Sequence, residues 1–313
     1  MSILEAIIQG IVQGLTEFLP VSSSGHLSLA QHIMGVELDS LVFDIILHVG
    51  TLIAVLAVYY KLIIRLIAEF FRMLKDIFTG KFSFKNMNYD RKLIFLLIVG
   101  LIPLFALFIP VPGTDMKLKD LSDMWATDST VLVEGIAFLM TSTLLFIGII
   151  RDKKSRSKTV TTPDGKTLYF TGRKKLRFSD AVVMGIAQCA AAVFPGLSRS
   201  GSTMSSGLIK GVNKQAALDY SFVLGIPAIL AAAVLSLRDV SGEAAGVGVP
   251  AMIAGLVSSA VVGFLAIKLF KWLVSSDKLI VFAVYTLVLG VATIVVAIIE
   301  AQTGTNIFAG LFN

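Results

Sequence analysis

The sequence has only one cysteine, Cys189, so its 313 residues cannot form an internal disulfide. It also has no Lys or Arg among residues 1–40, and therefore lacks the basic region with which a signal peptide begins. We expect no N-terminal segment to be removed. Charged residues are scarce, at 15%, whereas 56% of the residues are hydrophobic. The mean hydropathy of +0.85 is too high for a soluble domain of this length, so we expect the surrounding solvent to be lipid.

Six long apolar stretches are present. A helix needs about 20 apolar residues to cross a bilayer, and each stretch is close to that length. The predicted fold class is therefore an all-α polytopic membrane protein. Residues 61–78 alternate apolar and basic residues at helical spacing, which predicts a surface-lying cytoplasmic extension. The predicted spans are residues 41–60, 91–111, 130–150, 216–237, 249–272 and 279–300.

The net charge of +6 would suit a nucleic-acid-binding protein, but the positions of the basic residues favour membrane orientation instead. Residues 61–92 hold eight Lys or Arg and residues 151–178 hold ten, whereas the tail at 301–313 has none. The connection 112–129 carries four Asp against two Lys. We expect the basic loops to face the cytoplasm and both termini to lie outside, and we expect no nucleic-acid partner.

An internal repeat relates the two halves of the chain. A shift of 175 residues aligns AIIQGIVQGLTEFLPVSSSGH (6–26) with AVVMGIAQCAAAVFPGLSRSG (181–201). The identities include Gly10 with Gly185, Gln13 with Gln188 and Ser23 with Ser198. Chance similarity between Ala- and Gly-rich membrane helices is the alternative. Three predicted spans follow each copy, and chance does not explain that shared context.

Each copy combines a short helix, a Pro-centred break and a second short helix, a pattern typical of a re-entrant hairpin. The predicted hairpins are residues 3–38 and 179–210, and basic residues at both ends of the second keep its ends on the cytoplasmic face. Because three spans follow each hairpin, the two repeats have inverted topology, and we expect the two tips to meet near mid-membrane. The predicted organisation is a first repeat at 1–150, a basic cytoplasmic linker with a small β-hairpin at 151–178, and a second repeat at 179–313.

Polar side chains are concentrated at the two predicted tips, where their burial in hydrocarbon is costly and so indicates a site. Gln13 and Glu17 are four residues apart, which puts them on one helix face. Arg199 lies just ahead of a short helix, whose free N–H groups and positive dipole end attract anions. An Arg fork combined with such groups predicts a phosphate-binding site. The remaining tip residues, some of which could serve only to satisfy freed backbone groups, are Ser22, Ser23, Ser24, His26, Ser198, Ser200, Ser202 and Thr203.

Two segments carry a resemblance to a known family. EFLPVSSSGH (17–26) and PGLSRSGST (195–203) resemble the signature segments of the undecaprenyl-diphosphate phosphatases, and FDIILHVGT (43–51) and the order of spans agree. The resemblance implies hydrolysis of undecaprenyl diphosphate to the monophosphate and inorganic phosphate in the bacterial inner membrane. It further implies a place in cell-wall lipid recycling and bacitracin resistance, and a divalent cation, Mg²⁺ or Ca²⁺. Many members have Glu at the position of Gln13, which weakens any scheme with two carboxylates on the metal.

The resemblance assigns catalysis to Glu17, Ser23, His26 and Arg199. It puts Gln13, Ser198, Ser200 and Thr203 with Arg199 in phosphate binding, and Glu17 in metal binding. The nucleophile stays open between Ser23 with His26 as its base, and His26 attacking directly or activating water. Asp44 and His48, four residues apart, are either partners of the site or a locally satisfied polar pair.

Two other functions compete. Inverted repeats with broken helices are also typical of secondary transporters and lipid flippases, although a transporter has no need of a Glu, Ser and His grouped with an anion-binding Arg. The type-2 phosphatidic acid phosphatases share the short SGH element at 24–26, but no His follows Arg199 as their pattern requires. The expected partners are the polyprenyl diphosphate lipid and the bilayer, and a homodimer is left open.

Overall fold

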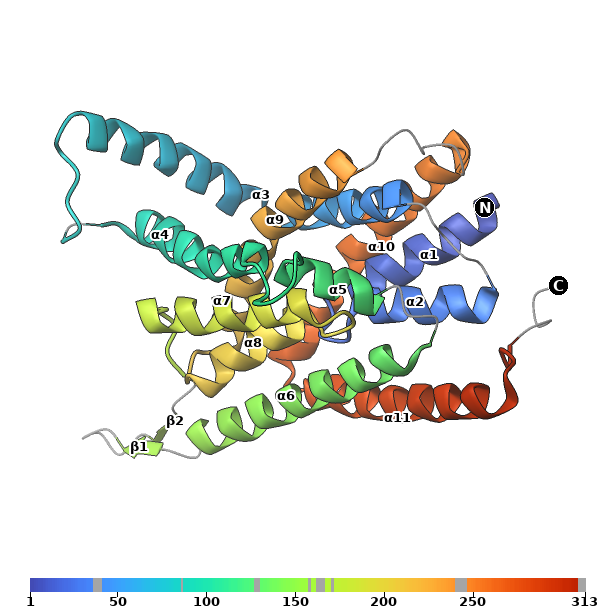
Figure 1. The fold of residues 1–313 in the computed structure, drawn as a ribbon. Coiled ribbons are helices and arrows are strands. Elements are labelled where there is room, and N and C mark those ends of the chain that lie inside the picture. Colours follow the sequence, from blue (N-terminus) through green and yellow to red (C-terminus); the bar gives the residue numbers. More distant parts are fainter. Residues whose placement is uncertain are drawn as a thin grey trace.

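The computed structural model describes residues 1–35, 41–85, 87–126, 130–156, 159–161, 167–169, 172–239 and 247–308 (Figure 1). Within these residues the fold is helical apart from two short strands and the connecting turns. The elements are α1 Ile3–Thr16, α2 Ser23–Met34, α3 Leu41–Phe78, α4 Tyr89–Leu101, the 3₁₀ helix η1 Ile102–Phe108, α5 Leu118–Ala126, α6 Leu132–Arg156, β1 Thr159–Thr161, β2 Thr167–Tyr169, α7 Phe178–Val193, α8 Arg199–Ile209, α9 Lys214–Asp239, α10 Val249–Ser275 and α11 Ile280–Thr303.

Six helical segments in the described part of the chain are long and apolar enough to cross a membrane. They are α3, α4 together with η1, α6, α9, α10 and α11. The expected all-α architecture with six spans is therefore confirmed, and the chain is a multi-pass membrane protein. Helix α3 departs most from its expected range, because it continues beyond residue 60 to Phe78 with a kink at Tyr59, where φ is −104° and ψ is 15°. That the part after the kink lies on the membrane surface stays a prediction.

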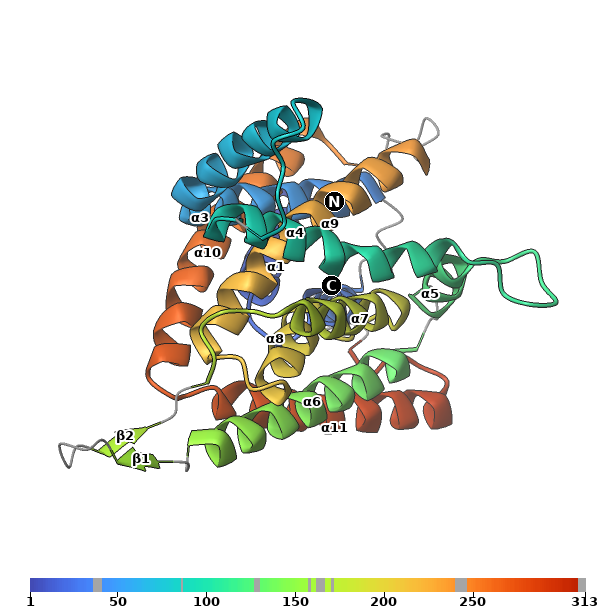
Figure 2. The ribbon, with the colours of Figure 1, turned by 90° about the vertical axis from the view of Figure 1, so that its left-hand side faces the viewer.

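Two helix hairpins fill the centre of the molecule. Helices α1 and α2 are joined through residues 17–22, and α7 and α8 through residues 194–198. Both breaks contain a proline, which cannot continue the hydrogen bonding of the helix before it. Gly196 in the second break has a φ of +82°, a conformation that L side chains rarely adopt. Figure 2 shows α7 and α8 lying between α4 and α6.

The packing of the hairpins repeats between the two halves. Helix α1 packs on α10 and helix α7 packs on α4, while α3 packs on both α9 and α10, and α6 packs on both α8 and α11. The glycines aligned by the sequence repeat make both hairpin contacts, since a Cβ on Gly10 would collide with Gly255 and one on Gly185 with Gly100. Small residues at such positions let helix backbones approach closely. The contact of α3 with α10 is much larger than that of α9 with α4, its counterpart in the repeat, so the packing is only partly two-fold. The two-fold relation of the halves and their inverted orientation in a membrane stay predictions.

The two ends of the helix bundle hold different segments of the chain. Figure 1 shows the N-terminus and the end of α11 together at one end, with the strands and the last part of α3 at the other. Strands β1 and β2 pair antiparallel, with Thr159 opposite Tyr169, as the expected β-hairpin requires. The turn expected at residues 163–165 lies outside the described residues.

Candidate active site

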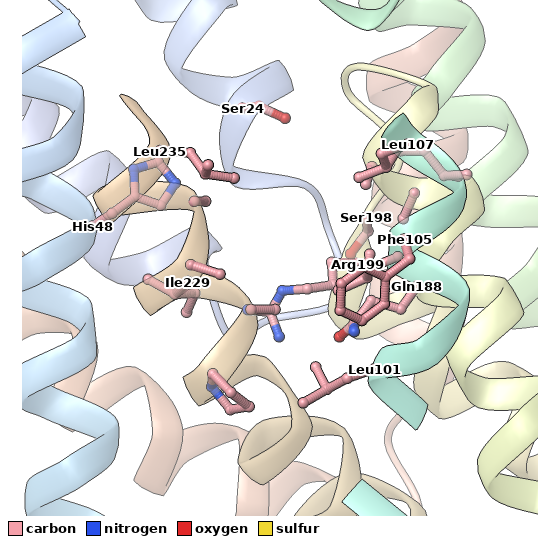
Figure 3. A pocket seen from close by; sticks show the side chains of 18 of the residues that line it. Ser24, His48, Leu101, Phe105, Leu107, Gln188, Ser198, Arg199, Ile229 and Leu235 are labelled. Atoms are coloured by element: carbon pink, nitrogen blue, oxygen red, sulfur yellow. The ribbon is translucent and has the colours of Figure 1, made fainter. Parts of the chain in front are cut away.

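A cavity of about 580 Å³ lies between the two hairpin tips, η1 and α9. One part of its lining is polar and comes almost entirely from the two hairpins. The larger part is apolar and comes from the end of α4, η1 and α9, including Leu101, Phe105 and Ile229 (Figure 3). The cavity therefore combines a polar end with apolar walls. The polar lining residues are Glu17, Ser22, Ser23, Ser24, His48, Gln188, Ser198 and Arg199.

An ion pair joins the two hairpins at this polar end. Glu17 directly follows α1, and Arg199 is the first residue of α8. Nη2 of Arg199 donates to Oε1 of Glu17 at 2.6 Å, and the two side chains are 19% and 5% exposed. Such a buried pair offsets the cost of desolvation only when its geometry is good and other hydrogen bonds complete it.

Three further groups surround the second carboxylate oxygen of Glu17. The Ser23 hydroxyl donates to Oε2 at 2.7 Å, and Nε2 of Gln13 donates to it at 3.1 Å. Nε2 of His48 lies 3.9 Å from the same oxygen, while Nδ1 of His48 donates to the Asp44 carbonyl at 2.8 Å. The carboxylate of Glu17 is thus the centre of a cluster that contains a hydroxyl, an amide, an imidazole and a guanidinium.

The N-termini of two helices contribute to the polar end. Ser22 caps α2 by accepting from the Gly25 N–H at 3.2 Å, and Ser198 caps α8 by accepting from the Gly201 N–H at 3.0 Å. Ser22 has a φ of 76°, an uncommon conformation for a residue other than glycine. Helix N-termini carry partial positive charge and free N–H groups, so this end of the cavity favours an anion.

Helix α9 gives the Arg199 guanidinium its space. A Cβ added to Gly225 would collide with Nη1 of Arg199, so the absence of a side chain at Gly225 lets the guanidinium lie against the α9 backbone. Nη2 of Arg199 bonds to Glu17, whereas Nη1 is buried and has no hydrogen-bond partner in the described part of the chain. Arg199 therefore keeps the two N–H groups of Nη1 for a ligand.

Not every residue expected at the site lines the cavity. Nδ1 of His26 donates to the Ser22 carbonyl at 2.6 Å, and Nε2 accepts from the Tyr285 hydroxyl at 2.8 Å, so both ring nitrogens are engaged away from Glu17. The Ser200 hydroxyl donates to the Leu19 carbonyl at 3.1 Å, and the Thr203 hydroxyl to the Arg199 carbonyl at 2.8 Å. These bonds tie the tips together or hold α8 in place.

The comparisons with known proteins agree with this site. The model of the family described as bacitracin resistance protein BacA matches residues 6–292. The chain belongs to the BacA family. It is 36% identical over 302 residues to an undecaprenyl-diphosphatase of Methanosphaera stadtmanae, with 96% of this chain and 99% of that protein covered. Similar proteins with the same name occur in Alkaliphilus metalliredigens, at 39% identity with 93% and 97% covered, and in Treponema denticola, at 36% with 93% and 96% covered.

Two residues at the polar end of this BacA-family cavity had weak signals in the sequence. His48 could be recognised only as one of two polar residues on a span, and the structure brings it to Glu17 because α3 packs beside α1. Gln188 was visible only as the repeat partner of Gln13. The structure puts it in the cavity lining, so the repeat itself was the signal that could have found it.

The polar end of the cavity offers a divalent cation some oxygen ligands but not a complete set of protein ligands. No group of three or more His, Cys, Asp or Glu that could hold a metal occurs within the described ranges. Glu17 offers a carboxylate, and Oε1 of the neighbouring Gln13 is buried without a hydrogen-bond partner among the described residues. Mg²⁺ is commonly held by one or two protein oxygens together with substrate phosphates and water, so these two residues fit a cation shared with a phosphate ligand.

Proposed function

We propose that this chain is a membrane phosphatase that hydrolyses undecaprenyl diphosphate to undecaprenyl phosphate and inorganic phosphate. Membership of the BacA family and the relatives named undecaprenyl-diphosphatase, 34 to 39% identical over most of the chain, support this activity. The observation that carries the proposal is the Arg199, Glu17 and Ser23 cluster at the polar end of an apolar-walled cavity. The activity belongs to the recycling of the cell-wall carrier lipid and accounts for bacitracin resistance.

The cavity suits both parts of such a substrate. A diphosphate needs cationic and N–H donors, which Arg199 and the N-termini of α2 and α8 supply. A polyprenyl chain needs an apolar surface, which the lining residues of η1 and α9 supply. A soluble phosphate compound has no apolar chain to bury against that surface, so the combination of the two surfaces favours a lipid substrate.

Ser23 is the proposed nucleophile and Glu17 the proposed base. As the diphosphate takes over the Arg199 donors, the Glu17 carboxylate becomes free to accept the proton of the Ser23 hydroxyl, which lies 2.7 Å from Oε2. The Ser23 oxygen then attacks the terminal phosphorus, and the bond from that phosphorus to the bridging oxygen breaks. Undecaprenyl phosphate leaves, and water later releases inorganic phosphate from the serine. Arg199 stabilises the charge that develops on the phosphoryl oxygens.

His26 has a positioning role in this scheme. Its bonds to Ser22 and Tyr285 hold the first turn of α2, the turn that begins with Ser23. A Tyr285→Phe variant tests this role, because it removes the hydroxyl but keeps the stacked ring. The expected result is a lower turnover rate at an unchanged pH profile, whereas a shifted pH profile would favour His26 as the base.

A divalent cation, Mg²⁺ or Ca²⁺, is part of the proposal. Glu17 and Gln13 are the residues that would hold it. The cation would supply positive charge to the diphosphate oxygens. Replacement of Gln13 by Glu adds a carboxylate beside Glu17 and is expected to tighten cation binding. Titration of phosphate release with Mg²⁺ after chelator treatment measures this, and an unaltered midpoint would exclude Gln13 as a ligand.

The deciding experiment measures phosphate release from undecaprenyl diphosphate by the purified protein in detergent. Detergent removes compartments, so a transporter or flippase gives no signal while a phosphatase does. The Ser23→Ala variant serves as the blank for contaminating phosphatases. Release that is equal in the blank and the native protein would reject the proposal.

The proposed location is the bacterial cytoplasmic membrane, with basic loops in the cytoplasm and both termini outside. The exposed residues Lys81 and Thr305 lie at opposite ends of the helices and allow a direct test. In a Cys189→Ala background, a cysteine at position 305 should react with an impermeant reagent added to intact cells, and one at position 81 should not. The reverse pattern would overturn the orientation.

A further inference from the structure

Gln188 is a buried amide in the cavity lining. It lies on α7, it is 1% exposed, and neither Nε2 nor Oε1 has a hydrogen-bond partner among the described residues. Figure 3 shows it among the side chains around the cavity, together with Arg199 and Phe105. An amide in this state lacks the bonds that normally offset its removal from water.

The other two buried glutamines of the described structure differ in this respect. Nε2 of Gln13 donates to Glu17, and Oε1 of Gln9 accepts from Gln31 at 3.2 Å. An unsatisfied buried amide costs on the order of 1–3 kcal/mol, whereas an apolar side chain of similar shape at the same position would cost nothing. A buried glutamine without protein partners is therefore best explained by a ligand that accepts its hydrogen bonds.

A second unpaired donor lines the same cavity. Nη1 of Arg199 is buried without a partner in the described part of the chain, while Nη2 is held by Glu17. Gln188 and Arg199 both line the cavity and each has a buried N–H donor without a partner among the described residues, while Glu17 is the one carboxylate among the lining residues. An oxyanion would satisfy both unpaired donors, Nε2 of Gln188 and Nη1 of Arg199.

The neighbours of α7 indicate which part of the substrate meets Gln188. Helix α7 packs against η1, whose residues form part of the apolar wall. Gln188 is thus on the helix that connects the Arg199 end of the cavity with the surface suited to the polyprenyl chain. Ser23, the proposed nucleophile, must face the terminal phosphoryl group, because that group is the one transferred.

We propose that Gln188 donates hydrogen bonds to the phosphoryl group that stays on the lipid. This inference rests on the proposed phosphatase function and deepens it by dividing the diphosphate between two sets of residues. Arg199 and Ser23 act on the terminal phosphate, and Gln188 holds the retained one. A contact that is made equally in the ground state and the transition state changes KM more than kcat.

The test uses Gln188→Met, which keeps an unbranched side chain of similar length but has no amide. The KM for undecaprenyl diphosphate and the inhibition constant of undecaprenyl monophosphate should rise by the same factor, about 10-fold for one lost hydrogen bond to a charged group. The inhibition constant of inorganic phosphate and kcat should stay nearly constant. The melting temperature without ligand should not fall, because the substitution removes two unpaired polar atoms.

Gln9→Met is the matched control. Gln9 is equally buried but lies away from the cavity and has a protein partner, so its loss should lower the melting temperature and leave both inhibition constants unchanged. Gln188→Glu keeps the shape and adds a negative charge, and it should weaken monophosphate binding more than Gln188→Met does. It also serves if the Met variant does not fold.

Two results would overturn the inference. Unchanged monophosphate inhibition in both Gln188 variants removes the proposed contact, and weakened inhibition by inorganic phosphate alone assigns Gln188 to the other phosphoryl group. A failure of the proposed function looks different. In that case the native protein releases no phosphate, although the monophosphate still raises its melting temperature in a Gln188-dependent way.

Discussion

The two helix hairpins have a common construction and opposite chemistry. In the register of the repeat, Gln13 corresponds to Gln188 and Ser23 to Ser198, whereas Glu17 corresponds to Ala192 and Arg199 to Ser24. All of the second set line the cavity. The first hairpin therefore supplies the negative charge where the second has a small residue, and the second supplies the positive charge where the first has one.

This difference explains how one charged pair can form between two similar elements. If both halves carried Glu at the equivalent position, two carboxylates would face each other in a buried site, which is unfavourable without a cation. The small residues Ala192 and Ser24 leave the room that a ligand needs beside the pair. The two aligned hairpins thus contribute different residues to one asymmetric site.

The two aligned serines give the largest expected contrast. Ser23→Ala removes the proposed nucleophile and should lower turnover on the order of 10⁴-fold. Ser198→Ala removes the cap of α8 and should cost about 1 kcal/mol of stability with a much smaller loss of turnover. Phosphate release and thermal unfolding in detergent measure the two effects, with Ser258→Ala as a control outside the cavity. Equal losses of turnover would mean that Ser23 is not the nucleophile.

Glu17→Gln tests the carboxylate that only the first hairpin has. The amide keeps the shape but leaves Arg199 without its counter-charge and Ser23 without a base, so turnover should fall on the order of 10³-fold. Glu300→Gln is the matched control, because Glu300 pairs with His32 and is not among the cavity residues. Full activity of Glu17→Gln would show that this carboxylate only lines the cavity.

Arg199→Lys tests the guanidinium that only the second hairpin has. Lysine keeps the charge but not the planar fork that can bond Glu17 and a phosphate together, and we expect a loss of about 10²-fold in kcat/KM. Arg65→Lys is the control, since that side chain is 59% exposed. Near-normal turnover in Arg199→Lys would reduce the role of Arg199 to charge alone.

Gly225→Ala gives the smallest effect in this series. The added methyl would displace the end of the flexible Arg199 side chain, so the fold should survive while kcat/KM falls roughly 10-fold through misplacement of the guanidinium. A Cβ on Gly248 would meet its nearest neighbour at 3.7 Å, and Gly248→Ala is therefore the neutral control. Identical kinetics of the two variants would show that Arg199 does not depend on α9.

The sequence was sufficient to predict the six spans. Lipid imposes a length and an apolar composition on each span, and both can be recognised in the sequence alone. It also located both hairpins and the residues that became the Glu17 and Arg199 pair, since the repeat aligned the two Pro-containing breaks. The extension of α3 beyond Tyr59 was expected from its alternating pattern, although not as one helix interrupted by a kink.

Contacts between elements far apart in the chain could not be predicted. His26 was expected to serve as the base for Ser23, or to attack or activate water itself, and these roles stay predictions. Its contact with Tyr285, which is 259 residues away, had no signal in the sequence. The space for Arg199 at Gly225 likewise depends on how α9 packs against α8. Local patterns identify which side chains are costly to bury, whereas only the packed fold decides which of them meet.

The 3₁₀ geometry of η1 has a consequence for lipid recognition. Three residues per turn place side chains three apart directly above one another, so Ile102, Phe105 and Phe108 form a straight column, where an α-helix would spread them around its axis. All three line the cavity and are 42 to 70% exposed. An isoprenoid lying along this column would meet three aligned apolar side chains, whereas on an α-helix the same residues would present a spiral.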